Sequence, residues 1–258
     1  MSVILVEGGR KLSGAVTVQG AKNSVLPMLA ATVLCPGVCC LRGCPTLSDV
    51  DTAVQIIRHL GGTVHREGPD LVVDTRQITG CEIPEELMGR MRSSVMFLGA
   101  ILGRCGEAVC SQPGGCDLGP RPIDLHLYAL RAMGAEIEEK SGRLRCRGAV
   151  LHGAEIFLRT PSVGATENAI LAACAASGTT VISNAAREPE IMELQDFLRA
   201  MGACVQGAGS ATVVVEGRKK LHGCTHRVRP DRIVAATYLC AAAGAGGCVY
   251  LHRADYRH

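Results

Sequence analysis

The sequence predicts an α/β fold in which helices are buried at the centre and sheets lie outside. Three observations predict it. Units of about 70 residues recur along the 258-residue chain, each unit contains a helix that is apolar almost all round, and its strands mix polar and apolar residues. A helix that is apolar on every side is buried, whereas such strands suit a sheet with one face in water. We therefore expect an inside-out arrangement, the reverse of the common α/β barrel.

The repeat is recognised from amphipathic helices that end in nearly the same way. These endings are RHLGGTV (58–64), RAMGAEI (131–137) and RAMGACV (199–205). Gly61, Gly134 and Gly202 each suit a left-handed helix cap, and a strand follows each of them. Self-similarity at a fixed spacing indicates a repeat architecture.

The predicted buried helices precede these amphipathic helices. They are SVLPMLAATVL (24–34), SSVMFLGAIL (93–102) and ATENAILAACAA (165–176), with AVTVQG, EAVCSQ, TTVISN and TVVVEG among the strands. A fourth unit begins at RPDRIV (229–234) and supplies a buried-type helix and one strand before the sequence ends. Residues 1–21 contain strand patterns without a helix, so we expect them to belong with this fourth unit.

Composition excludes several classes of protein. Apolar residues make up 47%, charged residues 20%, and the net charge is +3; a nucleic-acid-binding protein usually has a strong basic excess. The first residues lack the charge and cleavage pattern of a signal peptide, and no uncharged apolar run reaches membrane-spanning length. Fourteen cysteines without a secretory signal predict reduced thiols and a cytoplasmic protein.

A metal site is not expected. Cys35, Cys39, Cys40 and Cys44 lie close together in the sequence, but they lack the paired C-x2-C spacing of structural zinc sites. Several of them occupy apolar positions, where cysteine behaves as a small hydrophobic residue.

Basic residues lie at the predicted starts of two buried helices. Lys22 opens the first, and Arg90 and Arg92 open the second, although a cation opposes the helix dipole there. The third helix begins with Ser162 and Gly164, which offer a hydroxyl and accessible backbone N–H groups. A bound anion would interact favourably with the cations and the free N–H groups at all three helix starts. The alternative for each cation is that its side chain simply reaches solvent.

Glycines and prolines determine the backbone conformation of the stretch SQPGGCDLGPRP (111–122). Such a loop is costly in conformational entropy. Either it is a connector, or it holds Cys116 and Arg121 in one place. An Arg121 guanidinium near Cys116 would favour the thiolate, whereas an inert apolar cysteine would not need this loop.

These motifs together resemble the UDP-N-acetylglucosamine 1-carboxyvinyltransferase family. The resemblance runs in order along the whole chain through QGAKNS (19–24), MRSS (91–94), PGGCDLGPRPIDLHL (113–127), PSVGATEN (161–168), NAAREPEI (184–191) and RVRPDRI (227–233). It implies an inside-out α/β barrel of the enolpyruvyl transferase type, with two similar domains of three repeats and an active site between them. It also implies that residues 22–229 form one complete three-repeat domain, and that residues 1–21 and 230–258 form an incomplete part of the second.

The resemblance implies transfer of the enolpyruvyl group of phosphoenolpyruvate to the 3-hydroxyl of UDP-N-acetylglucosamine, with release of phosphate. This is the first committed step of peptidoglycan precursor synthesis. It proceeds through a tetrahedral phospholactoyl intermediate and implies neither a cofactor nor a metal. The expected partners are these two small molecules, not nucleic acid or membrane.

The same resemblance assigns roles to individual residues. The implied catalytic residues are Cys116, for proton delivery, with Lys22 and Arg121, which bind the phosphate of phosphoenolpyruvate. The implied substrate-binding residues are Lys22, Asn23, Arg92, Arg121, Pro122, Ile123, Asp124, Leu125, Ser162, Val163 and Gly164. His126 either stacks near the uridine or has a structural role.

The family's catalytic base and further phosphate-binding arginines are expected in a C-terminal part that this sequence does not contain. The sequence is therefore expected to be a truncated form, unable to complete turnover by itself. Two alternatives stay open: a UDP-sugar-binding module without catalysis, and a nonfunctional product.

Overall fold

The computed structural model describes residues 3–114 and 122–255. The chain divides into two compact units. Unit 2 consists of residues 22–228, and unit 1 consists of residues 1–21 together with 229–258. That unit 2 is a complete domain of the family stays a prediction.

Unit 2 repeats one order of elements three times: buried helix, strand, amphipathic helix and a two-stranded hairpin. The first repeat contains α1 (Lys22–Thr32), β2 (Val38–Arg42), α2 (Ser48–His59), β3 (Thr63–Glu67) and β4 (Asp70–Asp74). The second contains α3 (Glu85–Arg90), the 3₁₀ helix η1 (Arg92–Met96), α4 (Phe97–Cys105), β5 (Glu107–Ser111), α5 (Asp124–Ala132), β6 (Glu136–Lys140) and β7 (Arg143–Arg147). The third contains β8 (Glu155–Phe157), α6 (Val163–Ala175), β9 (Thr179–Ser183), α7 (Pro189–Ala200), β10 (Cys204–Gln206) and β11 (Thr212–Glu216), and β12 (Thr225–Arg227) follows it.

The three sheets of unit 2 share one topology. In each, the last strand of the hairpin lies in the middle and pairs antiparallel with both neighbours, giving the orders β2-β4-β3, β5-β7-β6 and β9-β11-β10. A further segment runs parallel to the first strand of each sheet: β12 along β2, β8 along β9, and a bridge from Glu82 to Val109 of β5. Because β12 follows the third repeat and pairs with the first, unit 2 closes on itself.

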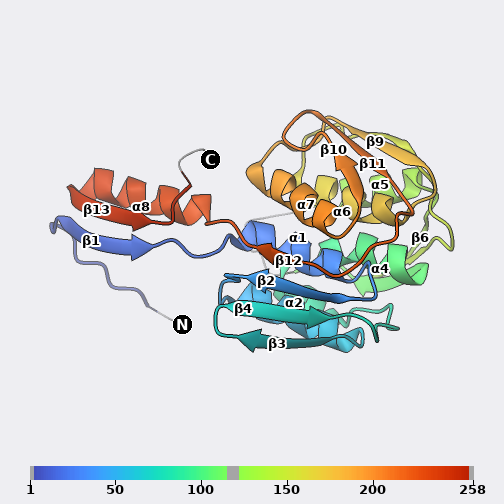
Figure 1. Cartoon of the computed structure of the whole chain (residues 1–258), viewed down its shortest axis with the longest axis horizontal. Helices are drawn as coiled ribbons and strands as arrows, with labels where there is room; N and C mark the ends of the chain where they lie inside the picture. Colours follow the sequence, from blue (N-terminus) through green and yellow to red (C-terminus); the bar gives the residue numbers. More distant parts are fainter. Residues whose placement is uncertain (1–2, 115–121, 256–258) are drawn as a thin grey trace. The chain divides into compact units, whose positions relative to one another are not determined.

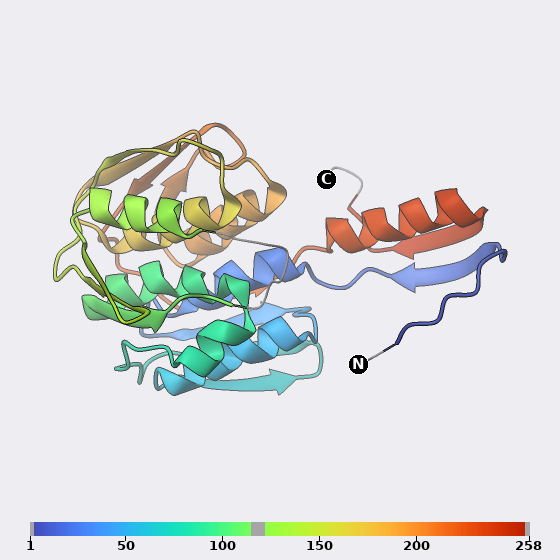
Figure 2. The same ribbon diagram turned by 180° about the vertical axis from the view of Figure 1, so that it is seen from behind.

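The helices lie inside and the sheets outside, as predicted (Figure 1). In α1 every residue from Ser24 to Thr32 is buried, and in α6 every residue from Ala165 to Cys174. The strands bury alternate residues, so that β4 places Leu71 and Val73 inward. The helices α1, α4 and α6 pack against one another, and the view from behind shows them between the outer sheets (Figure 2).

The predicted glycine caps are confirmed. Gly61, Gly134 and Gly202 have φ values of 103°, 91° and 95°, in the left-handed region that favours glycine. Each follows an amphipathic helix, α2, α5 or α7, and precedes a strand. The recurring glycine therefore sets the same helix-to-strand turn in each repeat.

The start of the second buried helix differs from the prediction. Arg90 does not open this helix; it lies in the last turn of the separate helix α3 and pairs there with Glu86. Arg92 then begins η1, which leads into α4. A cation at the end of α3 agrees with the helix dipole, so Arg90 needs no anionic ligand to compensate it.

Unit 1 contains β1 (Leu12–Thr17), α8 (Arg232–Ala245) and β13 (Gly247–His252). The two strands pair in parallel, with Leu12 opposite Gly247. Asp231 caps α8, because its Oδ1 accepts hydrogen bonds from the N–H groups of Ile233 and Val234 at 2.9 and 3.1 Å.

The buried-type helix of the fourth unit is exposed in the structure: α8 has no buried residue. Within unit 1 it packs on a two-stranded sheet, which is too small to enclose a helix that is apolar on several sides.

Candidate functional site

The N-terminus of α6 forms one wall of a pocket in unit 2. Ser162 is the N-cap residue, and its Oγ accepts a hydrogen bond from the Ala165 N–H at 3.4 Å. Val163 and Gly164 follow, in the first turn, where the backbone N–H groups have no partner within the helix. The positive end of the helix dipole also lies here, so this wall suits an anion.

The opposite wall comes from the second repeat. Nη2 of Arg92, at the start of η1, donates a hydrogen bond to the carbonyl oxygen of Pro122 at 3.2 Å. This contact joins the beginning of η1 to the residues that precede α5. It also places the Arg92 guanidinium beside the same pocket as the α6 N-terminus, so that both walls present positive charge.

His126 lies between these walls, on α5, and is buried. Its Nδ1 lies 3.2 Å from Nδ2 of Asn168 on α6, and Oδ1 of Asn168 accepts the Gly99 N–H at 2.8 Å. Since Nδ2 of Asn168 is a donor, Nδ1 of His126 is the acceptor, and the neutral imidazole carries its proton on Nε2. Burial, and the positive charge of Arg92, lower the pKa of His126 to about 4.

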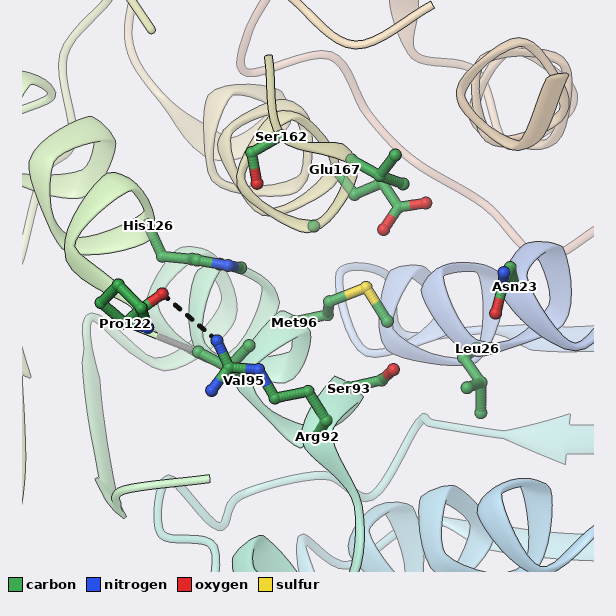
Figure 3. A pocket seen from close by; sticks show the side chains of 12 residues that line it. Asn23, Leu26, Arg92, Ser93, Val95, Met96, Pro122, His126, Ser162 and Glu167 are labelled. Carbon is green, nitrogen blue, oxygen red and sulfur yellow. Dashed lines mark hydrogen bonds between the residues drawn. The ribbon is translucent and has the colours of Figure 1, made fainter. Parts of the chain in front are cut away.

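The pocket has a volume of about 550 Å³, and its lining residues come from all three repeats (Figure 3). It is lined by Asn23, Leu26, Arg92, Ser93, Val95, Met96, Pro122, His126, Ser162, Val163, Gly164 and Glu167. Six of these are residues that the sequence predicts to bind substrate: Asn23, Arg92, Pro122, Ser162, Val163 and Gly164. The fold therefore brings together side chains that are far apart in the chain.

The first turn of α1 supplies the third side of the pocket through Asn23. Pro27 lies four residues later within the same helix. Since proline has no N–H, it cannot donate to the carbonyl of Asn23, as an ordinary residue would. Both the side chain and the backbone of Asn23 therefore offer polar groups near the pocket.

Lys22 is not among the residues that line the pocket. Its Nζ lies 3.1 Å from Oδ2 of Asp49, in the first turn of α2. The Asp49 carboxylate therefore supplies a negative charge near the cation at the start of α1. A phosphate-binding role for Lys22 stays a prediction.

The other predicted residues lie elsewhere or outside the described residues. Ile123 is buried in the core, Leu125 packs against it, and Asp124 pairs with Arg159; these three do not line the pocket, and their substrate-binding role stays a prediction. Cys116 and Arg121 fall within 115–121, outside the described residues.

Glu167, Ser93 and Met96 line the pocket but were not predicted from the sequence. Glu167 is only 2% exposed, and burial and the negative charges of Glu190 and Glu188 raise its pKa well above the usual range. The one available signal was an acidic residue in a helix that is otherwise apolar on every side. Such a residue is almost never fully buried without a partner.

Neither a metal cluster nor a membrane-spanning helix is found in the described part of the chain. Within residues 3–114 and 122–255, no three His, Cys, Asp or Glu side chains lie close enough to hold a metal ion. The helices of the same residues are too short or too polar to cross a bilayer.

Curated relatives match the whole chain. UDP-N-acetylglucosamine 1-carboxyvinyltransferase 2 of Caldanaerobacter subterraneus subsp. tengcongensis is 52% identical over 258 residues, and the protein of the same name from Streptococcus thermophilus is 47% identical over 261 residues. Both alignments cover 100% of this chain, which spans 62% of the length of each relative. The resemblance read from the motifs is confirmed.

Solved structures match the fold. The enolpyruvyl transferase NikO of Streptomyces tendae superposes with a TM-score of 0.84 at 26% identity, over 95% of this chain and 58% of that one. EPSP synthase of Acinetobacter baumannii superposes with a TM-score of 0.76 at 22% identity, over 96% and 57%. The predicted inside-out fold of the enolpyruvyl transferases is confirmed.

The sequence profile of one family, described as EPSP synthase (3-phosphoshikimate 1-carboxyvinyltransferase), matches residues 6–258. The match covers almost the whole chain and agrees with both the fold and the named relatives. The chain therefore belongs to the EPSP synthase family.

Proposed function

We propose that this chain acts in the transfer of the enolpyruvyl group from phosphoenolpyruvate to the 3-hydroxyl of UDP-N-acetylglucosamine, with release of phosphate. The observation that carries the proposal is the pocket in which Asn23, Arg92 and the Ser162–Gly164 turn meet. Relatives that are 47–52% identical bear the name of this activity. Since the chain spans 62% of their length, the activity, its substrates and its place in peptidoglycan synthesis are proposals.

The pocket suits the nucleotide sugar. Arg92 and the N-terminus of α6 present positive charge to a diphosphate, because a guanidinium and free helix N–H groups both bind phosphate oxygens. Pro122 and the neutral His126 form a less polar side, suited to a base or ribose. Asn23, on α1, lies with Leu26 and Met96 on another part of the lining, where we place the sugar.

The chemistry requires a proton on the methylene carbon of phosphoenolpyruvate and removal of the proton from the sugar hydroxyl. We assign proton delivery to Cys116, and binding of the phosphate to Lys22 and Arg121. The matched loop PGGCDLGPRP supports this assignment by its sequence. Substrate contacts are also assigned to Ile123, Asp124 and Leu125, and residues 22–229 are proposed to form one domain of the enzyme. We place the reaction in the cytoplasm.

A second candidate is a module that binds the nucleotide sugar without turnover. It is favoured because all twelve lining residues of the described pocket lie within unit 2. The transferase and the binding module require different groups of the chain. Turnover requires groups that bind and protonate phosphoenolpyruvate, whereas binding requires only the pocket.

The test combines titration calorimetry with UDP-N-acetylglucosamine and an assay of phosphate release from phosphoenolpyruvate. Binding with phosphate release supports the transferase, and binding without release supports the binding module. Absence of both contradicts the proposed function. Phosphate release that is unchanged in Cys116→Ala would contradict the role of Cys116.

The cysteine assignment has a separate test. An epoxide phosphonate of the fosfomycin type mimics a phosphate-bearing substrate and alkylates a thiolate. Peptide mass mapping should find the label on Cys116. A label on another thiol would remove the assignment.

A further inference from the structure

Glu167 is a buried carboxylic acid within the pocket lining. It lies on α6, among buried residues, and the residue is 2% exposed. Its Oε1 is buried and has no hydrogen-bond partner among the described residues. An unpaired buried polar atom destabilises a fold, so this side chain is not explained by folding alone.

The carboxyl group points into the pocket. Figure 3 shows it extending from α6 toward the side of the pocket where Met96 and Asn23 lie, away from Ser162. Glu167 and these residues all belong to the pocket lining. The carboxyl group therefore lies at the pocket wall, where a rotation of the side chain would turn Oε1 toward a molecule that enters.

Its surroundings favour the neutral acid. Burial is the first cause of its raised pKa, and the carboxylates of Glu190 and Glu188 add to it. A protonated carboxyl group has one O–H donor and also accepts hydrogen bonds. It can therefore pair with a hydroxyl or an amide, and it does not repel a diphosphate bound nearby.

The position of Glu167 along α6 suits a ligand that has an anionic part and a neutral part. Glu167 is four residues after Val163, which places both on one face of the helix about 6 Å apart along its axis. The helix N-terminus and Arg92 suit the anionic part of a ligand. Glu167 and Asn23 suit a neutral part that carries hydroxyl or amide groups.

We propose that Glu167 is a specificity-determining residue whose carboxyl group hydrogen-bonds a hydroxyl or amide group of the sugar of a nucleoside diphosphate sugar. The inference rests on the proposed function, since it concerns the same pocket. It goes further by assigning recognition of the neutral sugar to a residue on the buried helix. The nucleotide is recognised by the other parts of the pocket, which contain Arg92, the N-terminus of α6, Pro122 and His126.

The experiment compares the affinity for UDP-N-acetylglucosamine with that for UDP, by titration calorimetry on the 258-residue chain. Glu167→Leu should weaken binding of the nucleotide sugar by about tenfold or more, because it removes both the donor and the acceptor. Binding of UDP should stay within about twofold. Glu167→Gln keeps a donor and an acceptor, so its affinity for the nucleotide sugar should stay within about threefold of the wild type.

Thermal unfolding provides a readout that separates binding from folding. Glu167→Leu should raise the Tm, since it replaces an unpaired buried carboxyl group with an apolar side chain. A purely structural role predicts the opposite. Glu193→Gln is the matched control: Glu193 is also a buried glutamate, but its Oε1 lies 3.5 Å from Nε2 of His226 and it does not line the pocket. Both affinities should be unchanged in this variant.

The outcomes are distinct. If Glu167→Leu weakens the affinity for UDP and for UDP-N-acetylglucosamine equally, or weakens neither, the role of Glu167 is overturned. The proposed function is not affected by either result. A wild-type chain that binds neither molecule overturns the proposed function, and the role of Glu167 with it. Selective loss of the sugar-dependent affinity, with a raised Tm, supports the inference.

Discussion

Nδ1 of His126 accepts a hydrogen bond from Asn168 only while the imidazole is neutral. The amide orientation is fixed, because Oδ1 of Asn168 accepts the Gly99 N–H. Protonation of His126 would direct an N–H group at the amide NH₂ across a distance of 3.2 Å. This pair therefore links the charge of one residue at the pocket to the packing of α4, α5 and α6.

Acidification should destabilise unit 2 through His126. Its pKa is lowered to about 4 in the folded chain, whereas an unfolded histidine has a pKa near 6.5. The unfolded state binds the extra proton, so the free energy of unfolding should fall from pH 6.5 to pH 4, by on the order of 3 kcal/mol. Urea titrations of the wild type and His126→Gln across this range measure the difference. Parallel pH profiles would contradict the prediction.

Gly99 permits close packing between α4 and α6. A Cβ at this position would lie 2.5 Å from Oδ1 and 2.6 Å from the carbonyl oxygen of Asn168. Gly99→Ala should therefore lower the free energy of unfolding by about 1 to 3 kcal/mol through overpacking. In α3, a Cβ on Gly89 would meet nothing within 4 Å, so Gly89→Ala should be neutral or stabilising. Equal effects of the two variants in urea unfolding would refute this explanation.

Five thiols in the described part of the chain should fall into two reactivity classes. Cys240 and Cys248 are exposed. Burial raises the pKa of Cys110 and Cys174 to about 12 and that of Cys146 to about 11, and a protonated thiol is a poor nucleophile. With iodoacetamide near neutral pH, mass mapping should find Cys240 and Cys248 labelled before Cys110, Cys146 and Cys174. The three buried thiols should react only after unfolding; their early labelling in the folded chain would be inconsistent with the structure.

The exposed apolar surface of α8 should limit solubility. Leu239 is 61% exposed and Ile233 is 48% exposed on a helix without buried residues. Leu239→Lys should increase the soluble fraction and reduce binding of an apolar dye, because it breaks the apolar patch. Thr237→Lys, on the same helix, adds the same charge without removing apolar surface. If both variants improve solubility equally, net charge is the cause.

Much of the fold could be predicted because each repeat carries its own signals. The glycines after the amphipathic helices and the all-apolar buried helices fix the order of elements locally. The helix α3 was not predicted, since a six-residue segment is too short to show a period and depends on packing. The parallel additions of β8 and β12 were also missed, because three-residue strands leave almost no pattern.

The lining of the candidate pocket was predictable where it depends on motifs and not where it depends on packing. Asn23, Arg92 and the Ser162–Gly164 turn carry helix-start signals, and the structure brings them to one pocket. Glu167 was missed because its importance comes from the absence of a partner for Oε1 among the described residues. Sequence spacing does not reveal that.

The pairing of β1 with β13 has a consequence for synthesis on the ribosome. Leu12–Thr17 emerges early, yet its partner strand, Gly247–His252, is translated more than two hundred residues later. Unit 2 contains all the strands that its own sheets require, so it can fold while β13 is still being made. The nascent chain therefore carries β1 without its partner strand until β13 has been translated.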